Sequence, residues 1–172
     1  IQFHIKAPEF VMRQWYKHVV GIETTSNSST KDHAWNEISG RYVEYDEFYQ
    51  PSVYRKQSSD NKQASEGQFV GSEERQAHAN WTQAHAMTLS AYKQMIKMGM
   101  AKEQARCILP LTLYTEVYWT ASFQAVMNFI ELRNEKTAQI EIQQYAKVLL
   151  ALMHASFPKT TEIWADAHNW KK

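Results

Sequence analysis

Two polar clusters near the beginning of the chain carry side chains that could hold an anion together with a hydrogen-bonding ring. The first runs from Arg13 to His18 and the second from Asn36 to Tyr42. Each places cations beside amides and hydroxyls, and the second adds the carboxylate of Glu37; such groups bind phosphates and polar rings. Gly40 allows backbone N–H groups to approach an anion closely. The pattern predicts a phosphate cradle, although a surface turn with a solvated arginine has the same composition.

Two later arginines stand in apolar surroundings. Arg106 lies in the run ARCILP, and Arg133 follows Phe129 and Leu132. A buried cation must be paired or must bind an anionic ligand, because an unpaired buried charge is costly. For Arg106, a structural salt bridge is the alternative to an anion site. Arg133 has acidic neighbours that could pair with it, namely Glu131, Glu135 and Glu141.

The cysteine and histidine residues give little support to nucleophilic or metal chemistry. Cys107 is the only cysteine, has no base beside it in the sequence, and is expected to be a small core residue. His78 and His85 are seven residues apart, and no carboxylate stands at the spacing of an HExxH motif. We therefore expect no metal site.

Length and charge limit the classes of protein and partner. With 172 residues, 44% of them hydrophobic, the chain is long enough for a sizeable core, and a single domain over 1–172 is expected. The formal charge of +1 favours neither a nucleic acid polymer nor an anionic membrane as partner. A single cysteine fits a reducing cytoplasm, and the sequence contains no signal peptide or bilayer-spanning apolar run. Because the chain opens without an initiator Met, we expect that an N-terminal segment is missing.

Periodicity predicts the elements that must position the two clusters. Alternation over residues 1–5 predicts a strand, and Pro8 begins a helix that extends to about Val20. The polar residues 21–33 are expected to form a loop. Residues 43–49 are expected to form a second strand because of their aromatic and β-branched content. Residues 55–71 are polar throughout, which is typical of a functional or disordered loop.

The second half of the chain is mainly helical. A helix over 72–98 ends at Gly99 and carries an apolar stripe that is expected to be core. The stripe comprises Ala77, Trp81, Ala84, Met87 or Thr88, Ala91, Met95 and Met98. A short helix over 102–108 and a strand over 111–120 follow.

The C-terminal part contains three expected helices. Ser122 caps the first, which runs to Leu132; the second begins at Thr137 or a neighbour and is stopped by Pro158, and the last covers 162–168. Together the elements predict an α+β fold, with a small sheet packed with several helices. The aromatic content of 13% and the apolar late helices favour an oligomer.

Four blocks of sequence, in a fixed order, carry more information than composition. They are FHIKAPEFVMRQWYKH, WNEISGRYVEYDEFY, ARCILPLTLYTEVYWT and MNFIELRNEKTAQIEIQQYA. Along nearly the whole chain they resemble the flavin-dependent thymidylate synthases. The resemblance implies the fold of that family, a small twisted and mostly antiparallel sheet with helices, and a homotetramer with FAD sites between subunits. It also implies reductive methylation of dUMP to dTMP, with methylenetetrahydrofolate as carbon donor and NADPH as reductant.

The resemblance implies roles for the clusters and the two arginines. Arg133 matches the arginine that favours ionisation at uracil N3, and it is therefore the expected catalytic residue. The residues that match dUMP-binding positions are Gln14, Trp15, Tyr16, Lys17, Glu37, Ile38, Ser39, Gly40, Arg41, Arg106 and Arg133. The residues that match FAD-binding positions are Lys17, His18, Val19, Glu37, Ser122, Phe123, Gln124 and Asn128.

The sequence departs from the family pattern mainly on the flavin side. The family's Arg-His-Arg triplet is Lys17-His18-Val19 here, Gln124 stands where an arginine often contacts FAD, and Thr137 stands where a histidine is common. Residues 21–33 form an insertion, and a histidine-containing segment that normally precedes the first strand is absent. Two alternatives therefore stay open: a family member that binds dUMP but has lost flavin turnover, and a helical interaction protein.

Overall fold

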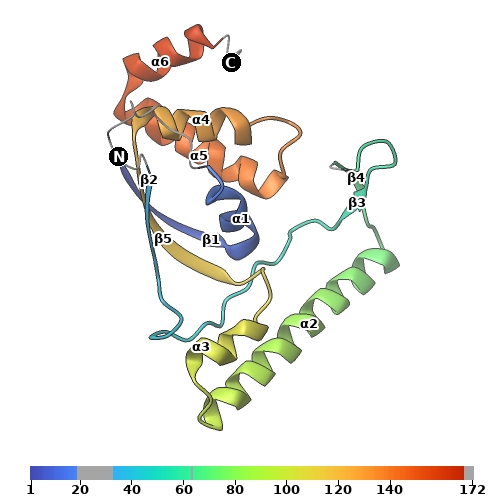
Figure 1. The fold of residues 1–172 in the computed structure, drawn as a ribbon. Coiled ribbons are helices and arrows are strands. Elements are labelled where there is room, and N and C mark those ends of the chain that lie inside the picture. The colour runs from blue at the N-terminus through green and yellow to red at the C-terminus, as the bar shows by residue number, and fades with distance from the viewer. Residues whose placement is uncertain (19–32, 63, 169–172) are drawn as a thin grey trace. The chain divides into compact units, whose positions relative to one another are not determined.

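The computed structural model describes residues 1–18, 33–62 and 64–168 (Figure 1). The chain divides into two compact units. The first, termed the sheet unit, comprises Gln2–Lys17 and Ala34–Thr120; the second, termed the helical unit, comprises Ile1, His18–His33 and Ala121–Lys172. No helix among the described residues is long and apolar enough to cross a bilayer.

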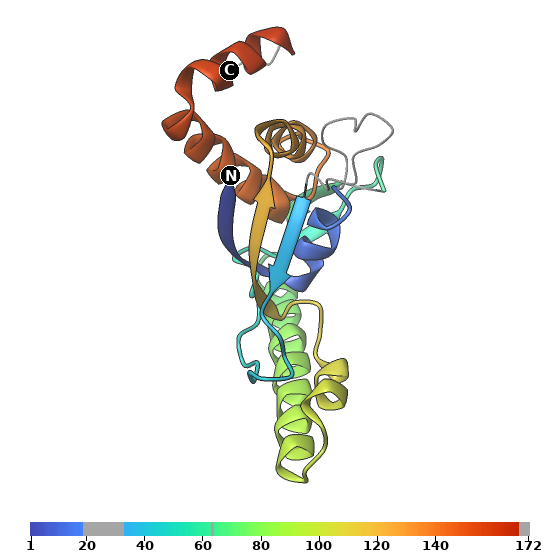
Figure 2. The same ribbon diagram turned by 60° about the vertical axis from the view of Figure 1, so that its left-hand side comes forward.

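The sheet unit is built around three strands. β1 (Gln2–Pro8), β5 (Tyr114–Ala121) and β2 (His33–Glu37) form one sheet with β5 in the centre (Figure 2). β1 pairs antiparallel with β5, and Ile5 lies opposite Val117. The strand predicted from the alternation of residues 1–5 is confirmed, and so is the strand expected within 111–120. The buried residues are Ile5, Ala7 and Pro8 in β1, and Thr115, Val117, Trp119 and Ala121 in β5.

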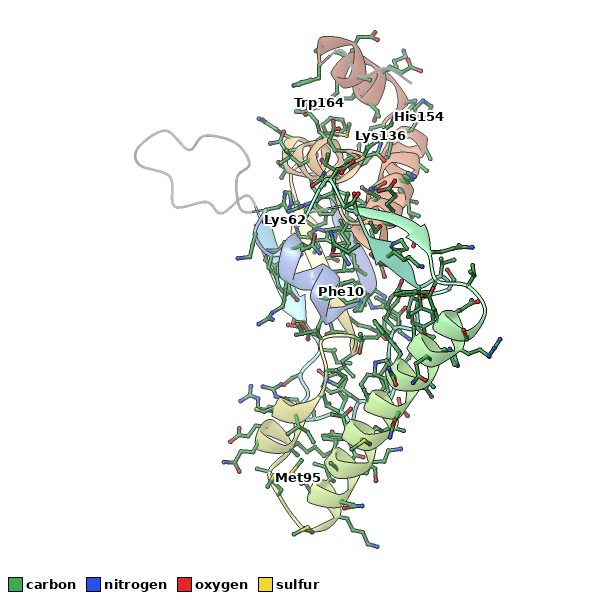
Figure 3. The ribbon with its side chains drawn as sticks, turned by 90° about the vertical axis from the view of Figure 1, so that its right-hand side faces the viewer. Phe10, Lys62, Met95, Lys136, His154 and Trp164 are labelled. Atoms are coloured by element: carbon green, nitrogen blue, oxygen red, sulfur yellow. The ribbon has the colours of Figure 1, made fainter. Side chains whose placement is uncertain are left out.

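The predicted strand over residues 43–49 is wrong. Within these residues, all of which the structure describes, Phe48 alone forms a bridge, to Leu113. The aromatic rings of this segment pack instead on helices. Phe48 stacks on His85 with ring centroids 4.8 Å apart. Tyr49 contacts edge-on, at 5.3 Å, the ring of Phe10, which is labelled in Figure 3. The aromatic content that suggested a strand therefore reflects side-chain packing.

The polar interval over 55–71 contains a hairpin that hydrophobic periodicity does not reveal. β3 (Arg55–Gln57) pairs antiparallel with β4 (Ser65–Gln68). The Gln57 side-chain amide donates to three backbone carbonyls of the connecting turn, at 3.0–3.3 Å from its Nε2 atom. These carbonyls belong to Asn61, Lys62 and Ala64. A single polar side chain thus organises the turn, as amide side chains commonly do.

α1 (Glu9–Trp15) packs on the sheet and ends before the predicted limit near Val20. Its fully buried side chains are Val11, Met12 and Trp15. The Trp15 ring contacts Trp119 edge-on at a centroid distance of 5.4 Å, and Trp119 stacks on Trp35 at 5.3 Å. Burying side chains of this size contributes about 1.5–3 kcal/mol each. The tryptophan cluster therefore fixes α1 and the polar residues that follow it.

α2 (Ser72–Lys97) confirms the predicted long helix, and Gly99 follows it with a φ of 90°. The predicted core stripe on this helix is wrong for most of its residues. Tyr92 is the buried residue of α2, whereas Met87 and Met98 are 65% and 84% exposed. Trp81 is the member of the stripe that packs inward, while Ala84 and Ala91 are exposed.

Aromatic and histidine side chains form the inward face of α2. The Trp81 indole N–H donates to the Tyr49 carbonyl at 3.2 Å, and its ring contacts His85 edge-on at 5.7 Å. His85 Nε2 lies 2.7 Å from the Thr112 hydroxyl. This face holds α2 against the segment that precedes the hairpin and against the residues before β5.

α3 (Lys102–Ala105) and a 3-10 turn, η1 (Arg106–Ile108), occupy the predicted short helix. Ala105 is buried, but Cys107 is exposed and its Sγ–H donates to the Glu103 carbonyl at 3.3 Å. The prediction that Cys107 belongs to the core is therefore wrong. The tightening of the helix into a 3-10 turn at Arg106 changes which side chains point inward.

The helical unit contains α4 (Phe123–Arg133), α5 (Ile140–Ser156) and α6 (Pro158–Ala167). Ser122 caps α4 as predicted, because its Oγ accepts from the Ala125 N–H at 3.1 Å. The predicted inward residues of α4 are all buried: Val126, Phe129 and Ile130. α6 begins at Pro158, four residues earlier than expected, because proline suits the first helical turn.

Candidate functional site

The residues that follow β2 form the first polar group, termed the turn site (Glu37–Arg41). The Ile38 N–H donates to the Glu116 carbonyl at 2.9 Å, so the backbone stays attached to β5 up to this point. Ser39 Oγ then accepts from the backbone N–H and the side-chain Nε of Arg41, at 3.4 and 3.5 Å. The hydroxyl and the guanidinium therefore lie together at the turn, and both can bind an anion.

Gly40 brings Arg106 to the turn site. A Cβ atom at Gly40 would lie 3.1 Å from Cδ of Arg106 and would collide with the ring of Tyr45. Glycine is thus required here for close packing. Arg106 is exposed, so its guanidinium is accessible to a ligand while its stem lies against the turn. The structure brings together a turn and an arginine that the sequence had indicated separately.

The carboxylate of the exposed Glu37 accepts a hydrogen bond from a buried hydroxyl of the sheet unit. Thr115 of β5 donates from its Oγ to Glu37 Oε1 at 2.7 Å. Thr115 is not among the residues that the sequence had indicated. Thr115 lies on the buried side of β5, and the pairing of β2 with β5 brings it to Glu37.

Glu9 is a second residue of this cluster that the sequence reasoning missed. The charge of the Glu37 carboxylate acts on its carboxyl group. Burial, and then the Glu37 charge, raises the pKa of Glu9, whereas Arg13 and Arg106 act in the opposite direction. The only sequence signal was its position one helical turn before Arg13, on the same face of α1.

Two tyrosine hydroxyls border the carboxylates. Burial, followed by the Glu37 charge, raises the pKa of Tyr16 strongly and that of Tyr45 as well. Both hydroxyls therefore remain protonated at neutral pH and can donate hydrogen bonds. Tyr45 Oη donates to the Ile38 carbonyl at 3.4 Å.

The remaining candidates near α1 differ in exposure. Trp15 is fully buried in the core, Gln14 is half-buried, and Lys17 is exposed. The Gln14 side chain donates to the Phe10 carbonyl at 3.3 Å. Of these three residues, Gln14 and Lys17 have side-chain amide and ammonium groups that a ligand can contact. Trp15 supports them by packing in the core.

In the helical unit, the structure brings Arg133 and His18 together across 115 positions of sequence. Arg133 Nε donates to His18 Nε2 at 2.7 Å, and the His18 ring contacts Phe129 edge-on at 5.0 Å. His18 must be neutral at Nε2 to accept this bond. Burial lowers the pKa of the half-buried Arg133 guanidinium, which indicates a poorly solvated cation.

The other flavin candidates lie in the first turns of α4. Gln124 is exposed and Asn128 is half-buried; four residues apart, they share one face of the helix. Their amides can donate to and accept from a polar ring system. Ser122 Oγ is used as the helix cap, and Phe123 packs edge-on against Phe157 at 5.9 Å. Val19 lies outside the described residues.

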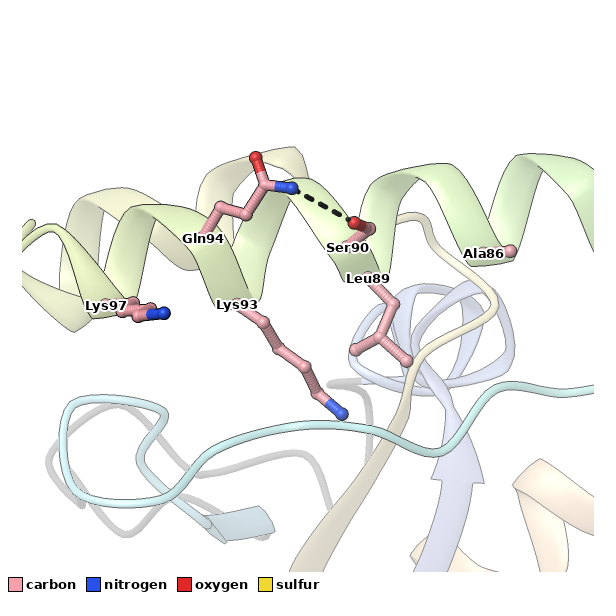
Figure 4. A pocket seen from close by; sticks show the side chains of 6 residues that line it. All are labelled: Ala86, Leu89, Ser90, Lys93, Gln94 and Lys97. Atoms are coloured by element: carbon pink, nitrogen blue, oxygen red, sulfur yellow. Dashed lines mark hydrogen bonds between the residues drawn. The ribbon is translucent and has the colours of Figure 1, made fainter.

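A separate hollow of about 490 Å³ lies along α2 (Figure 4). It is lined by Ala86, Leu89, Ser90, Lys93, Gln94 and Lys97, and no residue indicated by the sequence lines it. Across the described ranges, no group of three His, Cys, Asp or Glu side chains is arranged to hold a metal ion. Each unit thus carries its own candidate group: the turn-site cluster lies in the sheet unit and the Arg133 group in the helical unit.

Comparison with known proteins identifies relatives along almost the whole chain. A model of the family described as thymidylate synthase complementing protein (Thy1) matches residues 1–159. A flavin-dependent thymidylate synthase of Thermus thermophilus is 40% identical over 158 residues, which cover 91% of this chain and 53% of that protein. The flavin-dependent thymidylate synthase of Thermosipho africanus is 37% identical over 161 residues, which cover 93% of this chain and 65% of that protein. The chain thus spans between half and two thirds of the length of these relatives.

A solved structure supports the fold. The crystal structure of a UMP/dUMP methylase, PolB from Streptomyces cacaoi bound with 5-Br UMP, is similar with a TM-score of 0.80 and 24% identity. The match covers 96% of this chain and 72% of that one. The family model and the two relatives each match most of this chain. The chain therefore belongs to the Thy1 family of flavin-dependent thymidylate synthases, as its four sequence blocks predicted.

Proposed function

We propose that the full-length protein is a flavin-dependent thymidylate synthase that converts dUMP to dTMP. Methylenetetrahydrofolate would supply the carbon unit and NADPH the reducing equivalents. The observation that carries the proposal is the contact of Arg106 with Gly40, beside the hydroxyl of Ser39 and the guanidinium of Arg41. Two guanidinium groups, a hydroxyl and a turn without a Cβ atom form an arrangement suited to a nucleotide phosphate.

In this proposal the sheet unit binds dUMP. Ser39, Arg41 and Arg106 hold the phosphate, and Gln14 and Lys17 contribute hydrogen bonds. The protonated hydroxyl of Tyr16 is suited to donate to a ligand oxygen, whereas that of Tyr45 already donates to the Ile38 carbonyl. Glu37 is held by Thr115 with one oxygen, which leaves the other available to a ligand donor.

Arg133 is the proposed catalytic residue. Its guanidinium would stabilise the uracil ring ionised at N3, which makes the ring carbon nucleophilic without an enzymic thiol. A half-buried, poorly solvated guanidinium suits this role because a fixed cation in a water-poor site stabilises an anion better than solvent does. His18 would then exchange the Arg133 contact for contacts to the cofactor.

FAD is the proposed cofactor, and its proposed contacts are Lys17, His18, Val19, Glu37, Ser122, Phe123, Gln124 and Asn128. The amides of Gln124 and Asn128 on one face of α4 fit a ring system rich in hydrogen-bonding groups. When bound, FAD would supply the reducing equivalent for methyl formation. The Ser122 oxygen accepts the cap hydrogen bond, so a contact with FAD would use its O–H as the donor.

We also propose a cytoplasmic homotetramer in which the two units act as one catalytic domain. The exposed side chains of Met87 in α2 and of Met98 and Met100 just after it support association with further copies, because monomers rarely leave clusters of such residues in water. A family member that binds dUMP without flavin turnover is the second candidate, favoured by Gln124 and Val19 at positions where the family has arginine.

Absorption spectroscopy of the purified full-length protein tests the proposal. We expect a flavin band that NADPH bleaches and that returns only when methylenetetrahydrofolate and dUMP are both present. Binding of dUMP by a colourless protein that takes up no added FAD would support the second candidate. A protein that binds neither dUMP nor FAD would contradict both.

A further inference from the structure

A tyrosine to which the family resemblance assigns no role lies behind the turn site. Tyr45 follows Arg41 by four residues, and its half-buried ring folds back against Gly40. A Cβ atom at Gly40 would collide with Cε2 of this ring and would lie 3.1 Å from its Cζ. The ring therefore lies directly against the backbone of the turn, and glycine is the residue that permits such an approach.

Gly40 is enclosed on two sides. Cδ of Arg106 would lie 3.1 Å from the same added Cβ atom, and Gly40 is buried although Arg106 is exposed. The turn is also closed by its own backbone, because the N–H of Tyr42 donates to the Ser39 carbonyl at 3.0 Å. The position of this compact turn relative to Arg106 thus depends on the ring of Tyr45 that packs behind it.

The segment that carries Tyr45 is attached to its neighbours before and after the ring. Before it, Glu44 Oε1 forms an ion pair with Lys102 Nζ of α3 at 3.2 Å. After it, the Glu47 carbonyl accepts from the N–H of Tyr114 in β5 at 3.0 Å. Because the backbone around Tyr45 is tied to α3 and to β5, the ring offers the turn a fixed surface.

The ring of Tyr45 contributes more to this packing than its hydroxyl does. Tyr45 Oη donates to the Ile38 carbonyl, but a separation of 3.4 Å is long for a hydrogen bond between two oxygens. The ring atoms nearest to an added Cβ at Gly40 are the carbons Cε2 and Cζ. Phenylalanine has both of these atoms and alanine has neither, so the two substitutions separate the ring from the hydroxyl.

We propose that Tyr45 is a positioning residue for the phosphate of the bound nucleotide, because its ring fixes the turn at Gly40 opposite Arg106. The inference rests on the proposed function in taking the turn site as the phosphate site. Ser39 and Arg41 flank Gly40. A shift of the turn therefore changes the distance between their polar groups and the Arg106 guanidinium. Tyr45 touches neither the phosphate nor the reacting ring in this role.

Titration of the full-length protein with dUMP and with deoxyuridine separates this role from a general effect on the fold. Deoxyuridine has the same base and sugar without the phosphate, and its weaker binding is measured by competition with dUMP. Tyr45→Ala should weaken dUMP binding about tenfold, as expected when a charge-assisted contact is weakened. Its dissociation constant for deoxyuridine should stay at the wild-type value. Tyr45→Phe keeps the ring and should bind both ligands like the wild type.

Tyr118→Ala is the matched control, since it removes an exposed tyrosine of β5 and should leave both affinities unchanged. An equal loss for dUMP and deoxyuridine in Tyr45→Ala overturns the inference, and so does an unchanged affinity for dUMP. A loss in Tyr45→Phe as large as that in Tyr45→Ala also overturns it, because the hydroxyl would then carry the effect. A wild type that binds deoxyuridine as tightly as dUMP contradicts the phosphate site of the proposed function itself.

A double substitution tests the contact between Tyr45 and Gly40 directly. Gly40→Ala alone places a methyl group against the ring, whereas in the Tyr45→Ala background the nearest remaining atom is Cδ of the flexible Arg106 stem. Most of the dUMP affinity that Gly40→Ala loses in the wild type should therefore be retained in this background. An equal loss in both backgrounds overturns the inference. If Tyr45→Ala does not fold, Tyr45→Leu replaces it in both tests, since leucine fills part of the space without the distal ring atoms.

Discussion

Arg106 and Arg133 have different surroundings, and their proposed roles differ accordingly. Arg106 is exposed with its stem against Gly40, whereas Arg133 is half-buried and donates to His18 at 2.7 Å. An exposed guanidinium at a turn contributes mainly to ligand binding. A poorly solvated guanidinium can stabilise an anionic reaction intermediate more strongly.

Arg106→Ala should therefore weaken dUMP binding, and Arg133→Ala should reduce turnover more than it reduces FAD retention. Loss of a charge-assisted contact should cost Arg106→Ala about 1.5–3 kcal/mol, which corresponds to about ten- to a hundredfold in affinity. Titration calorimetry and the flavin absorbance of the purified variants measure these effects. Unchanged dUMP affinity in Arg106→Ala would mean that this arginine does not bind the nucleotide.

Gly40→Ala should damage the turn site although it adds only one methyl group. The new Cβ would collide with Tyr45 and press on Arg106, so one of the two side chains must move. We expect a loss of about 1–3 kcal/mol in the free energy of unfolding, as for other overpacked sites, together with weaker dUMP binding.

Gly67→Ala is the matched control. Gly67 has a φ of 65° with no atom within 4 Å of an added Cβ, so alanine there is strained but displaces nothing. Its unfolding free energy should fall by about 1–2 kcal/mol, while its dUMP affinity stays at the wild-type value. Equal dUMP affinities in both variants would show that close packing at Gly40 does not matter for the ligand.

The attachment of α2 involves a histidine whose burial favours the neutral imidazole. Burial lowers the pKa of His85, which lies 2.7 Å from the Thr112 hydroxyl and stacks on Phe48. The unfolded chain, where the histidine pKa is about 6.5, therefore binds the proton more readily than the folded protein. The stabilising contribution is present above this pH and is lost as the pH falls below it.

His85→Gln should consequently make the thermal stability of the protein less sensitive to acid. We expect the unfolding temperature of the wild type to decrease from about pH 7.5 to about pH 5.5 more steeply than that of the variant. His78→Gln changes a histidine on the same helix and should keep the steeper decrease. Parallel pH profiles for the wild type and His85→Gln would contradict this account of α2.

Two exposed methionines on the outward face of α2 are candidates for the contact between subunits of the proposed tetramer. Met87 and Met98 share one face, about three turns apart, and are 65% and 84% exposed. If the proposed tetramer forms through this face, Met87→Glu should lower the mass observed by sedimentation equilibrium. Thr82→Glu places the same charge on another exposed part of α2 and should leave the mass unchanged. A full-sized assembly in Met87→Glu would exclude this face as the contact.

Much of the fold was predictable because its signals are local. The alternation in β1 and β5, the Ser122 cap of α4 and the stop of α2 at Gly99 each depend on a few consecutive residues. The prediction of a strand over 43–49 is wrong because aromatic residues occur in side-chain packing as well as in sheets. The hairpin of β3 and β4 was not predicted because an exposed, polar hairpin has no hydrophobic periodicity.

The sequence by itself determined the family and most of the polar groups of the candidate site, because these lie in contiguous blocks of characteristic residues. Only the tertiary structure decided which of them meet. The contact of Arg106 with Gly40, the pair of Arg133 with His18, and the placement of Glu9 and Thr115 around Glu37 join distant segments. Such contacts depend on strand register and on the inward face of each helix, which are set by packing of the whole unit and not by any local pattern.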